Sequence, residues 1–141
     1  MQIGFLILTD HSEVLNGKVY AMGGGWNMLR FAQLPVEHSF GIGFGIDVAW
    51  DEANQRHTLE LETQDPDGER LGDELSFEIE VGRPPGSVTG QDQRVVISIQ
   101  ATATFSMPGP HAVVIRAGER EIGRSRFYVA ELPPEMRQQQ E

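Results

Sequence analysis

Apolar and polar residues alternate with a period of two along the middle of the chain. Leu59 and Leu61 share one side of their segment, whereas Glu60 and Glu62 share the other. This alternation is typical of a β-strand with one face on a core and one in water. It is found in three segments, residues 56–64, 74–81 and 94–104. A slip of one residue would bury carboxylates, so the pattern also specifies the register of these strands.

Turn-forming glycine, proline, asparagine and aspartate residues divide the rest of the chain into further strands. We expect these strands at residues 3–9, 18–22, 40–50, 111–116 and 122–129. Residues 10–17 have room for one capped helical turn between the first two strands. About eight strands with frequent turns and no amphipathic helix predict an all-β fold. We interpret it as an antiparallel two-sheet β-sandwich of immunoglobulin-like or related Greek-key topology.

The chain contains no repeat or composition change that would mark a second domain. We therefore expect a single domain over residues 1–132. Pro133 and Pro134 end the last strand, and residues 133–141 form a polar tail with little apolar surface. Such a segment is expected to be mobile.

Residues 40–50 carry large apolar side chains on one face and Gly41, Gly43 and Gly45 on the other. Each strand glycine costs about 0.5–1 kcal/mol relative to alanine, so three in alternation call for a compensating contact. One interpretation is that the protein's own atoms cover the glycines, with Trp26 as the best candidate. The other is that the flat strip receives a ligand ring or a partner's backbone.

Aromatic residues near this strip suggest one class of ligand. Trp26, Trp50 and Tyr20 are candidate stacking platforms for a small molecule or a carbohydrate. Together with the three glycines they are the binding residues that the sequence nominates.

Catalytic and metal-binding motifs are not found in the sequence. It has no nucleophile elbow, phosphate loop or dinucleotide fingerprint. The four histidines lack the close spacing of a metal site, so we expect no metal and no cofactor. Asp47, Asp51 and Glu52 are candidate residues for acid–base chemistry, but only their residue type supports that role. We therefore expect no catalytic residues and no enzyme.

The net charge of the chain limits the kinds of molecule that it is expected to bind. Eleven basic and twenty-one acidic side chains give a net charge of −10, which repels nucleic acid and anionic membrane surfaces. Cysteine is absent, and no apolar run approaches the length of a membrane helix. The expectation is a cytoplasmic protein that binds neither nucleic acid nor membrane.

Several short segments resemble a family of uncharacterised bacterial proteins. They are residues 16–20 (NGKVY), 23–26 (GGGW), 34–35 (LP), 83–86 (RPPG) and 108–109 (PG). This resemblance implies a stand-alone domain and adds no catalytic residue. Residues 108–129 are also similar to the last two strands of immunoglobulin-like sandwiches, although His111 stands where an aromatic residue is usual.

Extensive sheet without convergent catalytic chemistry favours a non-enzymatic structural or protein-interaction module. We expect a protein partner or self-association through a sheet face or an exposed edge.

Overall fold

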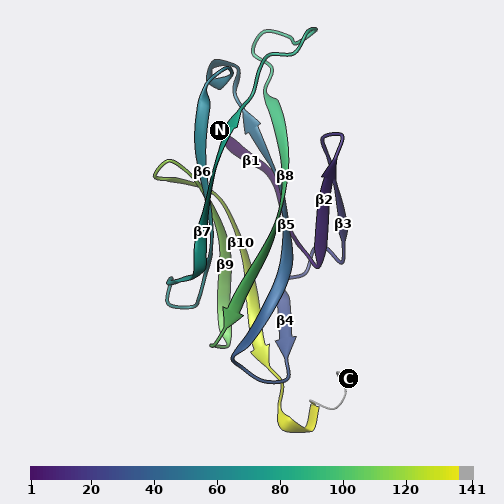
Figure 1. The fold of residues 1–141 in the computed structure, drawn as a ribbon, viewed down its shortest axis with the longest axis vertical. Helices are drawn as coiled ribbons and strands as arrows, with labels where there is room; N and C mark the ends of the chain where they lie inside the picture. Colours follow the sequence, from purple (N-terminus) through teal and green to yellow (C-terminus); the bar gives the residue numbers. More distant parts are fainter. Residues whose placement is uncertain (137–141) are drawn as a thin grey trace.

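The computed structural model describes residues 1–136, which form ten β-strands and, at residues 50–52 and 134–136, two short 3-10 turns (Figure 1). The strands are β1 (Gln2–Thr9), β2 (His11–Leu15), β3 (Lys18–Met22), β4 (Met28–Phe31), β5 (Val36–Val48), β6 (Arg56–Gln64), β7 (Arg70–Glu80), β8 (Gln93–Phe105), β9 (Gly109–Ala117) and β10 (Arg120–Glu131). The 3-10 turn η1 (Trp50–Glu52) follows β5. The fold is all-β, as the alternation predicts.

The strands form three sheets. A three-stranded sheet has the order β1-β5-β8, a five-stranded sheet has the order β4-β10-β9-β6-β7, and β2 and β3 form a separate hairpin. All pairs are antiparallel except β4 with β10, which run parallel. In Figure 1 β6, β7 and β9 of the five-stranded sheet lie on one side of β5 and β8, and the hairpin lies on the other.

The core lies between the two larger sheets. Strand β5 contributes every second residue, from Phe40 through Phe44 to Val48, and the facing sheet contributes side chains such as Val113 and Phe127. The apolar face of the long strand β5 is therefore a main part of the hydrophobic core. Leu59, Leu61 and Ile79, which alternation assigned to the interior, are buried here. Leu75 is 38% exposed because β7 is an edge strand, and Glu62, expected to face water, is buried beside Arg116.

Two strands were not expected from the sequence. Residues 11–15 form β2 rather than a helical turn, and residues 28–31 form β4. Both are short and give weak periodic signals, because two or three inward residues are too few to establish a period. With the separate hairpin and the parallel pair, the arrangement does not confirm a two-sheet, wholly antiparallel sandwich.

The C-terminal segment is described only in part. Pro133 accepts a backbone hydrogen bond from Met136 in a short turn, and residues 137–141 of the expected tail lie outside the described residues. Among residues 1–136, no helix is long and apolar enough to cross a membrane.

Candidate interaction surface

The glycine strip of β5 is covered by the protein's own side chains. Phe5, Ile7 and Thr9 of β1 pair directly with Gly45, Gly43 and Gly41. Residues directly opposite on antiparallel strands share one face of the sheet, so these side chains can lean over the bare backbone. A Cβ atom added to Gly45 would stand 2.5 Å from the Phe5 ring. The side chains of β1 thus fill the space that the glycines leave on this face of β5.

The β2–β3 hairpin adds a second cover to the same strip. A Cβ atom on Gly43 would lie 3.0 Å from Val19 of β3, and one on Gly41 would lie 3.0 Å from the backbone nitrogen of Ser12. The hairpin is tied to β8, because the Ser98 hydroxyl donates to the Ser12 carbonyl at 2.8 Å and the two hydroxyl oxygens are 2.6 Å apart. A ligand could reach the glycines only after the hairpin moved away.

Trp26 does not cover the glycines, which corrects the expectation of a Trp26 lid. It lies on the core side of β5, where its ring meets the edges of Phe40 and Phe127 at centroid distances of 5.8 and 5.7 Å. The parity of β5 explains the difference, since Phe40 and Gly41 point to opposite faces of the strand.

The other two nominated aromatic residues lie apart from the strip. Trp50 is in η1, where the Arg83 guanidinium stacks 4.1 Å from its ring centroid and also donates to its carbonyl at 2.5 Å. Tyr20 lies on the outward face of the hairpin and is 54% exposed. The structure therefore does not bring Trp26, Trp50 and Tyr20 together on one surface. Their role in binding stays a prediction.

Two of the three candidate carboxylates, Asp47 near the end of β5 and Glu52 in η1, take part in structural pairs. Arg94 donates to both oxygens of Asp47 at 2.7 and 3.1 Å, and these hydrogen bonds hold the pKa of Asp47 below its ordinary value. Hydrogen bonds from the Met1 ammonium at 2.7 and 2.9 Å likewise lower the pKa of Glu52. A general acid needs a raised pKa to hold its proton at neutral pH, and these shifts run the other way.

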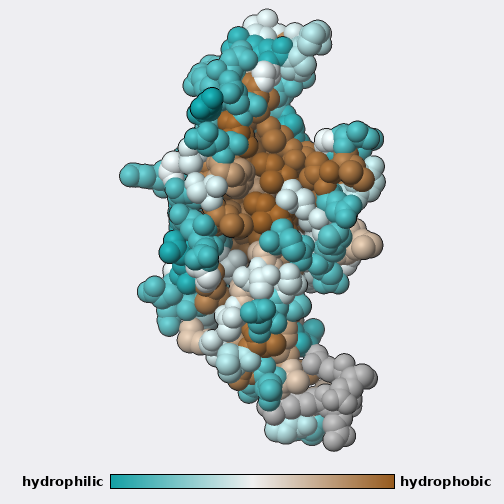
Figure 2. Space-filling view, viewed as in Figure 1, coloured by the Kyte–Doolittle hydropathy of each residue, from teal (hydrophilic) through white to brown (hydrophobic). Residues whose placement is uncertain are grey.

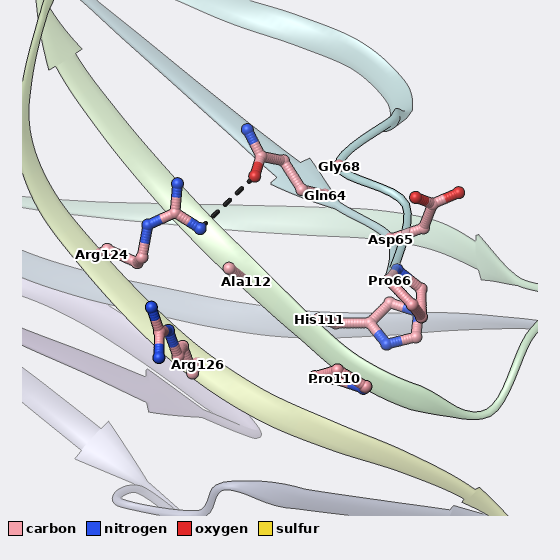
Figure 3. A pocket seen from close by; sticks show the side chains of 9 residues that line it. All are labelled: Gln64, Asp65, Pro66, Gly68, Pro110, His111, Ala112, Arg124 and Arg126. Carbon is pink, nitrogen blue, oxygen red and sulfur yellow. Dashed lines mark hydrogen bonds between the residues drawn. The ribbon is translucent and has the colours of Figure 1, made fainter.

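A hollow on the outer face of the five-stranded sheet has a volume of about 190 Å³ (Figure 3). One of its cations is already paired: Arg124 donates to Gln64, which also lines the hollow, at 3.4 Å, and to both carboxylate oxygens of Glu121 outside it, at 3.2 and 2.7 Å. His111 belongs to the core, since it is buried and its Nδ1 donates to the Gly109 carbonyl at 2.9 Å. Within residues 1–136, no group of three potential metal ligands comes together.

The surface that sequence reasoning missed is the free edge of β8. This strand ends the three-stranded sheet, and it pairs with β5 without a register shift over its whole length, from Gln93 to Phe105. Its other edge has no strand partner in the described part of the chain. The opposite edge of the same sheet is different, because β1 lies against β10 and Ile3 fills the space beside Gly123. The two larger sheets are therefore closed on the β1 side and open on the β8 side.

The residues along this edge are apolar and only half-buried. Val95, Ile97 and Ile99 point toward the core, and Val96 points toward the hairpin. Figure 2 shows a broad apolar area at the middle of the view, where β8 and the hairpin lie in Figure 1. The signal from which the site could have been found is the absence of charge and proline over residues 95–104, since edge strands usually carry such residues.

Strand β7 approaches β8 near Thr102. A Cβ atom on Gly72 would lie 3.8 Å from the carbonyl oxygen of Thr102. A hollow of about 310 Å³ opens there, and its apolar lining includes Leu61, Leu71 and Ala101. The first half of β8, residues 93–99, is thus the part of the edge left open.

Comparisons with solved structures give only weak likenesses. A Pseudomonas fluorescens alkylpurine DNA glycosylase, AlkC, is 12% identical with a TM-score of 0.47, and the match covers 73% of this chain and 27% of that one. A Listeria innocua β-glucosidase is 12% identical with a TM-score of 0.46, and the match covers 74% of this chain and 15% of that one. This chain thus spans about a quarter or less of either neighbour.

Among curated proteins, none matches the chain. A family model does match, over residues 4–130, and it describes a family of unknown function, DUF6941. Because the match takes in nearly the whole sequence, the chain belongs to the family of unknown function DUF6941.

Proposed function

We propose that this chain is a non-enzymatic protein-interaction module that binds a strand of a protein partner along the free edge of β8. One observation supports the proposal most directly: β8 lies at the edge of its sheet, yet residues 95–104 carry none of the charges or prolines that usually block an edge. Its core-facing residues Val95, Ile97 and Ile99 are apolar but only half-buried.

The composition of β8 supports the same role. An unpaired edge is a template for further pairing, and proteins usually block it with charges, prolines, bulges or a covering loop. Residues 95–104 contain no charged residue and no proline, and Arg94, the only charge on the strand, is paired with Asp47. Nothing in the strand's own sequence therefore blocks pairing.

The neighbouring edge, β7, provides a contrast within the same molecule. It carries four carboxylates, at Asp73, Glu74, Glu78 and Glu80. Its pairing with β6 shifts register opposite Leu61 and Thr63, and Gly72 has a φ of 71°. Charges and bulges are the usual means of protecting an edge. Of these two neighbouring edges, one is protected and the other is open.

A bound strand would extend the three-stranded sheet to four strands. Its backbone would supply the hydrogen bonds that β8 lacks, and its side chains would cover Val95 and Ile97 on one face and Val96 on the other. The partner segment is accordingly an extended strand with few charges and with apolar residues on the face toward the core. The tryptophan platform has less support, since Trp26 packs on phenylalanines and Arg83 covers Trp50.

A peptide with the sequence of residues 93–101 tests the proposal. Methylating every second amide nitrogen leaves one edge able to pair and prevents the peptide from aggregating, whereas methylating every amide removes both edges. The peptide methylated at every second amide, called the singly blocked peptide because one of its edges is blocked, is expected to bind and to slow amide exchange in residues 93–99. Binding should weaken in Val96→Lys and persist in Val88→Lys, which adds the same charge at a loop residue that is 69% exposed. Equal binding of the two peptides, or no effect of Val96→Lys, would contradict it.

A further inference from the structure

We infer that the strand that pairs with β8 is β8 of a second copy of this chain, and that the two copies form a symmetric dimer. This inference rests on the proposed function and specifies its partner. It follows from the chemistry of the edge, since β8 is itself an extended strand with no charge over residues 95–104 and with apolar Val95, Ile97 and Ile99 on its core-facing side.

Symmetry fixes the direction of such a pair. A two-fold axis perpendicular to the sheet makes the same strand of two copies run antiparallel, and each residue i that contacts j is matched by j contacting i. The two three-stranded sheets would then join into one sheet with the order β1-β5-β8-β8-β5-β1. Because the pairing is closed, it uses up both free edges and does not propagate into a fibre.

The position of the axis follows from the apolar run. With the axis at Ile97, Val95 faces Ile99 of the other copy, and Arg94 faces Gln100 of the other copy. No charged residue then lies directly opposite a like charge, which would be destabilising. The axis also lies in residues 93–99, away from the point where β7 approaches Thr102.

The net charge opposes this dimer and gives it a diagnostic property. Two copies of net charge −10 repel one another, and β7, with its four carboxylates, lies beside β8 on the same open side. Salt screens repulsion between exposed charges over about 8–10 Å at physiological ionic strength. The dimer dissociation constant should therefore fall as salt is raised, whereas a dimer held by opposite charges would weaken.

Sedimentation of the full chain over a range of concentrations is the first test. The expected result is a monomer–dimer equilibrium that salt shifts toward the dimer. Val96→Lys should raise the dissociation constant by about tenfold or more, because it places a lysine in the pairing edge of each copy. Val88→Lys should leave it unchanged, which excludes the shared change in net charge as the cause. A monomer at every concentration and salt would overturn the inference.

Disulfide cross-linking of variants that each carry one cysteine provides a second test. Because several positions are compared, the result does not depend on the folding of any one variant. The natural chain has no cysteine, so each variant of residues 95–99 would carry only one. A disulfide forms only where the two Cβ atoms lie about 3.5–4.5 Å apart. Oxidation is expected to give most dimer for Ile97→Cys, less at the flanking positions and little for Val88→Cys. Equal yields at all positions, or most from Val88→Cys, would overturn the symmetric pairing.

The two proposals fail in different ways. If the singly blocked peptide binds β8 but the chain stays monomeric, the edge binds a strand and the partner is another protein. If the peptide does not bind and the chain is monomeric, both proposals are wrong.

Discussion

Replacing Gly43 with valine would test whether the hairpin and β1 fill the glycine strip. The first carbon added would stand 3.0 Å from Val19 Cγ2 and 3.2 Å from Ile7 Cγ2, and valine brings two further methyl groups. Overpacking of this kind costs about 1–3 kcal/mol, and removing a strand glycine recovers about 0.5–1 kcal/mol. We expect a net loss of about 1 kcal/mol for Gly43→Ala and about 2 kcal/mol for Gly43→Val.

Urea unfolding followed by tryptophan fluorescence gives the free energy of unfolding for each variant. Gly82→Ala is the matched control, because its added Cβ would meet only Asn54, at 3.7 Å, and should change stability little. Truncating the opposing side chain, as Val19→Ala, should recover part of the loss when combined with Gly43→Ala. A Gly43→Val variant as stable as the natural protein would refute the covered strip.

Four further predictions concern residues away from the β8 edge. The pKa of Asp47 is lower in the folded state than its ordinary value of 3.8. Ionised Asp47 therefore stabilises the fold at pH values above 3.8, and this stability is lost as the pH falls through the folded pKa. Urea unfolding between about pH 6 and about pH 3 should therefore show a weaker acid dependence in Asp47→Asn, and an unchanged dependence would contradict the Arg94 pairing. Trp26→Ala should cost about 3 kcal/mol of unfolding free energy, because the ring packs on Phe40 and Phe127, and a loss below about 1 kcal/mol would argue against that packing. Arg83→Ala should change the fluorescence of Trp50 and cost about 0.5–1 kcal/mol, so an unaltered spectrum in a Trp26→Phe background would contradict the stacked pair. His111→Phe should keep the ring contact with Phe127 while losing the hydrogen bond to Gly109, for a cost of about 1 kcal/mol by thermal unfolding, and a loss above about 3 kcal/mol would show that the bond matters more.

The sequence predicts much of the core, because the side chains of a strand alternate whatever the topology. Leu59, Leu61 and Ile79 are buried on the side that the pattern assigned to them. The long strand through Phe40 and Phe44 was also evident, since its apolar residues recur at every second position. These inferences need only local periodicity.

The cover of the glycine strip could not be read from the pattern alone. It depends on β1 pairing with β5 in the register that puts Phe5 opposite Gly45, and on β2–β3 folding back over the same face. Both are contacts between distant segments. Trp26, which follows Gly23, Gly24 and Gly25 in the sequence, was the candidate cover, but strand parity places it on the other face of β5.

The open edge was also hidden until the sheet order was known. Whether β8 is a central or an edge strand depends on which strands pair, and periodicity does not report pairing. Residues 95–104 carry no charge and no proline, and a strand of that composition can lie in the middle of a sheet or at its edge. The unblocked edge in the observed sheet order is the reason to look for a partner at β8.

Amide hydrogen exchange measured at several protein concentrations tests this account most directly. Raising the concentration should slow exchange in residues 93–99 and leave β7 and β4, the edges of the other sheet, unchanged. Protection confined to another segment, or exchange along β8 that is fast at every concentration, would contradict the claim that this edge is where the protein pairs.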